Sequence, residues 1–291
     1  KGEIFNQEFY FSYKESLKDN KKLKNFLLKF KSLNLLSKVE IDNSEKINGK
    51  FKFKQSKNQL LGTFGYENNK IVIKNMNLKN IFLEGKSQGI ITLYPFFNFD
   101  INIDLNSINF NRMHSLLLKL DTKRKAELFK FSKKINGQLS LSVNKIFSKN
   151  NLIDSFESRL RFKNGNILVD SFLFNMPKLG AGDFVGTIQN EDKISKLKFE
   201  SNLFIDNLNN FYNKFGIYNK GTKDPFTMSI LGEFDFVKLS LFLNDISGNQ
   251  KFENYTLSNI EKEFNESLLI DGYESLFNYR KFKTFIKDIA N

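Results

Sequence analysis

The side chains that could do catalytic or metal chemistry are few, and the first of them is a single histidine. His114 is the only histidine in the chain of 291 residues, which contains no cysteine. A disulfide framework, a thiolate metal site and a cysteine nucleophile are therefore excluded. His114 stands beside Met113 on an apolar stripe and has no acidic partner at a catalytic spacing, so we interpret it as structural. With no catalytic, metal-ligating or cofactor-binding motif, the sequence is typical of a protein that is not an enzyme.

Four polar residues at every second position resemble the start of a calcium-binding loop. They are Asp100, Asn102, Asp104 and Asn106. The residues between them are all aliphatic, and the glycine that such a loop needs at its sixth position is missing. An alternating strand with one buried face explains this spacing better than a metal site does.

A glycine-rich segment, residues 180–186, superficially suggests a loop that cradles a phosphate group. Its spacing is not Gly-x-Gly-x-x-Gly, no Gly-Lys-Ser/Thr follows it, and the next residues read as a strand. Gly182 and Gly186 also have counterparts in Gly85 and Gly89, each 97 residues earlier (182 − 85 and 186 − 89). We interpret the segment as a hairpin turn.

The elements that must position these residues follow an internal repeat. Residues 47–53 return as residues 135–141 and again as residues 230–236, at offsets of 88 (135 − 47) and 95 (230 − 135). After the glycine of each copy, apolar and polar residues alternate, which predicts a strand with one buried face.

A second landmark, an apolar stripe at spacing i, i+3, i+4 and i+7, keeps a similar period and predicts four amphipathic helices. The stripes are Leu23, Phe26, Leu27 and Phe30; Met113, Leu116, Leu117 and Leu120; Leu208, Phe211, Tyr212 and Phe215; and Phe282, Phe285, Ile286 and Ile289.

Between these helices the sequence reads as short strands joined by Asn- and Gly-containing turns. It therefore predicts a β-rich α+β fold, in which repeated antiparallel strands form an elongated curled sheet and a short amphipathic helix ends each repeat. We expect one continuous module with four parts. These are residues 1–45, a leading segment with an amphipathic helix; 46–133, repeat 1; 134–228, repeat 2; and 229–291, a shortened repeat 3 with a C-terminal helix.

The formal net charge is +13, but only five of the 45 cationic residues are arginine. Nucleic-acid binders depend on arginine for bidentate contacts, so we interpret the lysines mainly as a solvated surface and do not favour nucleic acid as a partner. The expected helix in the basic segment 18–31 leaves two roles open, packing in the repeat or contact with an anionic membrane.

The strand-to-helix junctions at residues 99–113 and 204–211 resemble the recurring junctions of AsmA-like proteins. The strand openings at residues 47–53 and 135–141 are similar to that family's frequent openings, and the resemblance covers roughly residues 45–291.

The resemblance implies a bacterial envelope protein with a repeated sheet that curls into a trough with an apolar inner face. It implies a periplasmic location, an inner-membrane anchor preceding residue 1, and a part in outer-membrane assembly and phospholipid movement. The implied partners are phospholipid acyl chains, the envelope membranes and other envelope proteins, and no cofactor is implied.

We therefore expect an apolar sheet face that holds or conducts phospholipid, because each acyl CH₂ removed from water contributes about 0.8 kcal/mol without any polar recognition. The candidate groove residues are Phe51, Phe53, Phe99, Ile101, Ile103, Leu105, Phe199, Leu203, Ile205, Phe234 and Phe236. Two alternatives stay open. One is a structural or adhesin-like repeat protein with a closed core, and the other is a basic scaffold for a polyanion.

Overall fold

The structure is a computed structural model of the chain. It describes residues 2–4, 7–18, 21–42, 46–119, 131–191, 194–218, 222–248, 254–271 and 279–290.

The described residues form one sheet of 17 strands, as the β-rich pattern of the sequence predicts. The N-terminal strands are β1 (Gly2–Ile4), β2 (Gln7–Lys18), β3 (Lys21–Phe30), β4 (Leu35–Asp42), β5 (Ile47–Gln55), β6 (Asn58–Glu67), β7 (Lys70–Lys79), β8 (Leu83–Thr92) and β9 (Asn98–Asn109). The C-terminal strands are β10 (Asn136–Val143), β11 (Ile146–Phe147), β12 (Ser155–Lys163), β13 (Asn166–Met176), β14 (Gly180–Glu191), β15 (Ile194–Ile205), β16 (Phe226–Asp235) and β17 (Ser240–Ser247).

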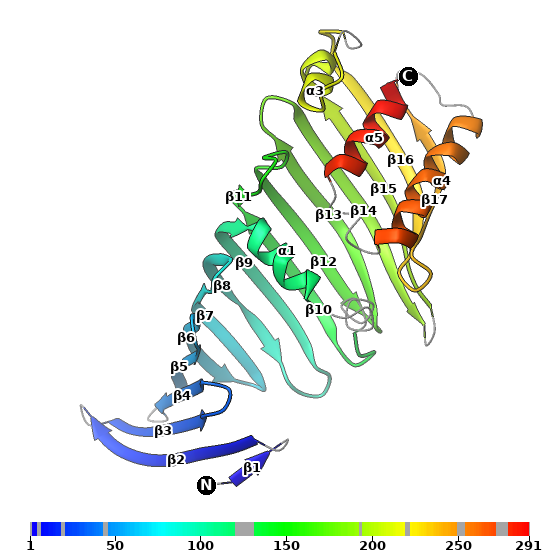
Figure 1. Ribbon diagram of the computed structural model, residues 1–291. Helices are drawn as coiled ribbons and strands as arrows, with labels where there is room; N and C mark the ends of the chain where they lie inside the picture. Colours follow the sequence, from blue (N-terminus) through cyan, green and yellow to red (C-terminus); the bar gives the residue numbers. More distant parts are fainter. Residues whose placement is uncertain are drawn as a thin grey trace.

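Nearly every strand pairs with its neighbours in the sequence, so the sheet is a long meander. The pairing is antiparallel from β1 to β9, between β10 and β12, and from β12 to β17. The exception is β9, which runs parallel to β10 and β11. A parallel pair needs a crossover, and here helix α1 (Phe110–Leu118) leaves the end of β9. Figure 1 shows the resulting elongated, curled sheet, with the two termini at opposite ends.

The strands before and after this crossover carry matching irregularities. Between β6 and β7 the register shifts so that Lys74 has no opposite residue, and between β12 and β13 Asp170 is left over in the same way. These two bulges lie 96 residues apart (170 − 74). An Asn side chain also caps the helix that follows β9 and the helix that follows β15. Asn109 accepts a hydrogen bond from the Arg112 amide, and Asn207 accepts one from the Asn210 amide. The strands β5–β9 and the set β10 with β12–β15 thus correspond, whereas the exact division of the chain into repeats stays a prediction.

The sheet has two chemically different faces, because side chains alternate along every strand. Residues that lie opposite one another on neighbouring strands project to the same face of the sheet. We name one of the two faces the apolar face. It holds Phe26 in β3, Phe51 in β5, Ile103 in β9, Leu160 in β12 and Leu203 in β15. The other face, here named the polar face, holds most of the lysines of the same strands.

The helices lie on the apolar face and cover its C-terminal half. They are α1, α3 (Leu208–Lys214), α4 (Asn254–Asp271) and α5 (Tyr279–Ala290). Side chains of α3, α4 and α5, among them Phe211, Ile260 and Ile286, are buried together with apolar-face residues of β13 to β17. Figure 1 shows α4 and α5 across the last strands and α1 across the middle of the sheet.

Three of the four predicted helical stripes lie in helices, namely α1, α3 and α5. Met113 packs against β9 and β10, and Phe211, Tyr212 and Phe215 are buried, as expected. Leu120 and the side chains of Leu117, Phe282, Phe285 and Ile289 lie outside the described residues.

The helix expected at Leu23, Phe26, Leu27 and Phe30 is wrong, because these residues belong to strand β3. Phe26 and Phe30 lie on the apolar face opposite Val39 and Leu35, while Leu23 and Leu27 project to the polar face. The run of three apolar residues from Phe26 to Leu28 satisfies either periodicity, and pairing with β2 and β4 decides for the strand. The basic amphipathic helix expected within residues 18–31 is therefore wrong as well.

Helix α4 is longer than any helix expected from the sequence. Its buried residues Leu257, Ile260 and Leu268, with Phe264 between them, are spaced by three or four residues. Within the described part of the chain, no helix combines the length and the apolar character needed to cross a bilayer.

Candidate functional site

The eleven candidate groove residues lie along the apolar face. Strand pairing places ten of them on that face, from Phe51 and Phe53 in β5 to Phe234 in β16. Phe236 directly follows β16 and is buried in the same cluster as Phe234. The structure thus brings them onto one surface but spreads them over much of the length of the sheet.

The candidates nearest the helices are part of a filled core. Leu105 is buried against α1, and Leu203 and Ile205 are buried with residues of α3, α4 and α5. Phe234 and Phe236 pack against Leu268 of α4. Protein side chains occupy this end of the apolar face, so it offers no open groove there.

The apolar face of β2 to β6 is not covered by any helix in the described part of the chain. None of its described side chains is buried, and the exposed fraction is 51% for Phe11 and 37% for Phe53. Phe51 lies over Gly62, and Phe64 lies over Gly49 on the neighbouring strand. These two rings therefore lie close over the backbone of the neighbouring strand, and aliphatic residues of β4 such as Val39 separate the rings of β5 from those of β3.

A hollow of about 240 Å³ marks the edge of this uncovered region. Apolar side chains from four strands and the start of β8 line it, namely Leu35, Phe53, Leu60, Leu78 and Leu83. Polar residues at the strand ends, such as Gln55 and Asn58, complete its rim. An alkyl chain could lie in it with its polar end at the rim.

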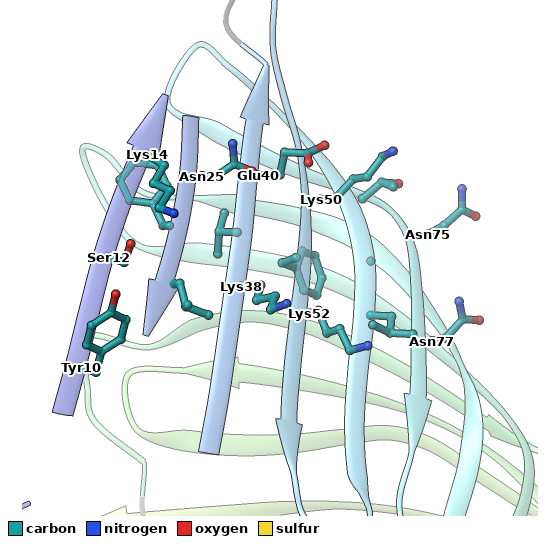
Figure 2. A pocket seen from close by; sticks show the side chains of 17 residues that line it. Tyr10, Ser12, Lys14, Asn25, Lys38, Glu40, Lys50, Lys52, Asn75 and Asn77 are labelled. Atoms are coloured by element: carbon teal, nitrogen blue, oxygen red, sulfur yellow. The ribbon is translucent and has the colours of Figure 1, made fainter. Parts of the chain in front are cut away.

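A larger hollow of about 750 Å³ lies behind the same strands, on the polar face of β2 to β7. The outer strands contribute only polar-face residues, Tyr10, Ser12 and Lys14 from β2 and Asn75 and Asn77 from β7. Figure 2 shows these side chains with those of the strands between them. We name it the basic hollow, because Lys14, Lys38, Lys50 and Lys52 line it and Glu40 is the one carboxylate among its described lining residues.

The basic hollow is not among the sites expected from the sequence, although part of its pattern is visible there. In β5 the lysines at 50 and 52 alternate with the phenylalanines at 51 and 53, so the two kinds of side chain must project from opposite faces. Lys14 and Lys38 come close to these lysines only through the register of the three hairpins from β2 to β5, and alternation within a strand does not predict that register.

The histidine, the alternating polar residues of β9 and the glycine-rich segment 180–186 all belong to the packing or pairing of the fold. The ring of His114 in α1 stacks on Phe110, with centroids 6.1 Å apart. Asp104 lies in β9 and accepts a hydrogen bond from the Ser142 hydroxyl at 2.7 Å. Gly180, Gly182 and their neighbours belong to strand β14 rather than to a turn, since the turn ends at Leu179. The described residues contain no cluster of three or more potential metal ligands.

The displaced pKa values also belong to structural groups. Burial raises the pKa of Tyr212 in α3 and that of Tyr279 in α5. A hydrogen bond to Glu15 raises the pKa of Tyr13, and a bidentate hydrogen bond to Asp170 raises that of Arg161. All four shifts favour the protonated form, so these groups keep their ordinary charge at neutral pH.

Comparison of the chain with protein-family models, with curated proteins and with solved structures finds no match. The resemblance to AsmA-like proteins therefore stays a prediction that depends on the strand-to-helix junctions and the strand openings of the sequence.

Proposed function

We propose that this chain holds phospholipid by its acyl chains on the uncovered apolar face of β2 to β6, as a non-enzymatic module of a bacterial envelope. The observation that carries the proposal is this uncovered surface, where the side chains from Phe9 to Phe64 stay partly exposed along five successive strands. Large contiguous apolar surfaces that stay exposed are typical of interaction sites and ligand-binding grooves.

The energetics favour an apolar ligand of extended shape. The uncovered face is continuous across neighbouring strands, and the rings of Phe51 and Phe64 lie close over the backbone. An alkyl chain laid across it gains roughly 25 cal/mol for each Å² of apolar surface removed from water. Such binding requires shape and area but no polar recognition.

The AsmA-like junctions supply the cellular part of the proposal. They favour a periplasmic module, anchored to the inner membrane by a preceding segment and acting in phospholipid transport and outer-membrane assembly. The stretch from β2 to β6 offers the same kind of surface on successive strands, which suits movement of a lipid across these strands.

The closed-core alternative describes the C-terminal half of the sheet. There α3, α4 and α5 occupy the apolar face, and residues such as Ile246 and Phe215 are fully buried. A structural role for this half is compatible with lipid binding at the other, because the two halves use different stretches of the same face.

Lipid extraction and native mass spectrometry of the purified chain test the proposal. We expect co-purified phospholipid, and uptake of a fluorescent fatty acid that Phe51→Asn weakens severalfold, because the substitution places a polar group on the uncovered face. Leu36→Asn is the matched control, since Leu36 lies on the neighbouring strand β4 but projects to the polar face, outside the basic hollow. Protein free of lipid that also takes up no probe would refute the proposal.

A further inference from the structure

We propose that the basic hollow binds phosphate groups of an organic phosphate, either a lipid headgroup or a soluble compound. This site lies on the face opposite the uncovered apolar face, so it does not depend on acyl-chain binding. The basic hollow has a volume of about 750 Å³, which falls in the range of about 300–1,000 Å³ typical of ligand sites.

Two adjacent rows of opposed residues build the basic hollow. One row runs across the strands as Lys14, Asn25, Glu40, Lys50, Thr63 and Asn75. The next row runs as Ser12, Leu27, Lys38, Lys52, Leu61 and Asn77. Opposed side chains on one face of a sheet stand about 5 Å apart, so the cations of the middle strands face the same space.

The charges of the basic hollow are unbalanced within the described residues. Lys38 stands directly opposite Lys52, an arrangement of like charges that disfavours the sheet by itself. Among the described residues, neither of them forms an ion pair, and the same holds for Lys14 and Lys50. A bound anion would supply the missing negative charge between the two strands.

The neutral groups of the basic hollow also suit an oxygen-rich ligand. Asn75, Asn77, Thr63 and Ser12 bring amide and hydroxyl groups to its wall. These groups donate hydrogen bonds to phosphate and hydroxyl oxygens, and lysine ammonium groups add point charges without a fixed geometry.

The same lining disfavours single-stranded nucleic acid. Such ligands need aromatic rings on which successive bases stack. Tyr10 is the one aromatic side chain that the polar face contributes to the described lining, because Phe26 and Phe51 project to the apolar face. The described lining contains no arginine either.

The test compares the full chain with a Lys38→Gln/Lys52→Gln variant. The probes are vesicles of phosphatidylcholine alone, vesicles that also contain phosphatidylglycerol, soluble pyrophosphate and a thymidine oligonucleotide. We expect binding to the phosphatidylglycerol vesicles, to pyrophosphate or to both, and a loss of about fivefold for each lysine removed. Vesicle binding without pyrophosphate binding assigns the headgroup, and the reverse assigns a soluble phosphate.

A Lys163→Gln/Lys196→Gln variant is the matched control, because it removes the same charge from β12 and β15, outside the basic hollow. It should bind within about twofold of the unchanged chain, since screening limits the effect of distant charges. Equal losses in both variants would overturn the proposal, and so would no binding to either phosphate probe or tighter binding of the oligonucleotide. The thermal midpoint of each variant without ligand separates loss of binding from loss of folding.

Discussion

Single glycines decide whether an aromatic ring can lie close to the sheet, as two glycines of β6 illustrate. Gly62 lies under the ring of Phe51, with the Asn75 carbonyl oxygen 2.8 Å from the place of a Cβ atom. At Gly65, three residues further along the same strand, the place of a Cβ atom lies 3.4 Å from its nearest neighbour, the Asn48 side-chain oxygen. The first glycine is needed for the close approach of a ring, whereas the second is not.

We expect Gly62→Ala to lower the free energy of unfolding by about 1–3 kcal/mol, because the methyl group must displace Phe51 or the backbone of β7. Gly65→Ala should leave it unchanged or raise it by about 0.4–1 kcal/mol, since alanine restricts the unfolded chain and fits the strand. Urea unfolding of the two variants measures the difference. Equal effects at both positions would show that the ring does not lie over Gly62.

At the scale of elements, one edge of the sheet is closed by a helix. Asn265 of α4 accepts from the Leu241 amide at 2.7 Å and donates to the Leu241 carbonyl at 2.8 Å, while Glu261 accepts from the Leu243 amide. Side chains of α4 thus take the place that a further strand would occupy beside β17. An uncovered edge strand is a template for pairing with another chain, so α4 protects this end.

We expect Asn265→Ala to lower the free energy of unfolding by about 1–3 kcal/mol, because it leaves two backbone groups of Leu241 without partners. Hydrogen exchange of the Leu241 amide should accelerate at the same time. Glu266→Ala, at an exposed position of the same helix, should change stability by no more than about 0.5 kcal/mol. Unchanged exchange at Leu241 would contradict the capping role of α4.

How far the sequence predicts these elements depends on whether a segment fits one periodicity or two. The strands with strict alternation, such as β9, and the helices after β9 and β15 follow from their patterns. Residues 26–28 are consecutive apolar residues, so the pattern allowed either a helix or a strand, and only the neighbours β2 and β4 decide. Helix α4 has apolar residues at 257, 260, 264 and 268, a spacing of three or four residues that is typical of an amphipathic helix.

The candidate surface follows from the sequence in part. Alternation alone places Phe51 and Phe53 with their cross-strand neighbours on one face, and the pairing agrees with this placement. Which stretch of that face is covered could not be predicted, because the helices that cover it pack against strands distant in the sequence, as Phe264 does against the cluster of Phe162 and Phe234.

The whole molecule is quasi-one-dimensional, since most strands contact only their neighbours in the sequence. In such proteins stability is roughly a sum of local and nearest-neighbour contributions, so it can differ from one end to the other. The C-terminal half has buried clusters beneath its helices, whereas none of the described side chains on the apolar face of β2 to β6 is buried.

We therefore expect a gradient of amide protection along the sheet. Without ligand, the amides of β3 to β6 should exchange through openings that cost several kcal/mol less than those of β13 to β16, because few buried contacts oppose local unfolding. Hydrogen-exchange mass spectrometry measures this gradient. Uniform protection from β3 to β16 would show that the sheet unfolds as one cooperative unit.

The parallel pairing of β9 with β10 gives the sheet a point at which it could lengthen during evolution. It joins the last strand of one unit to the first strand of the corresponding unit, so a tandem gene duplication of residues 46–133 could add a unit without altering any other pairing. Each added unit of five strands would lengthen the sheet by about 24 Å, at roughly 4.8 Å per strand. The span of such a protein would then change by whole units, and relatives of different length would differ by multiples of that step.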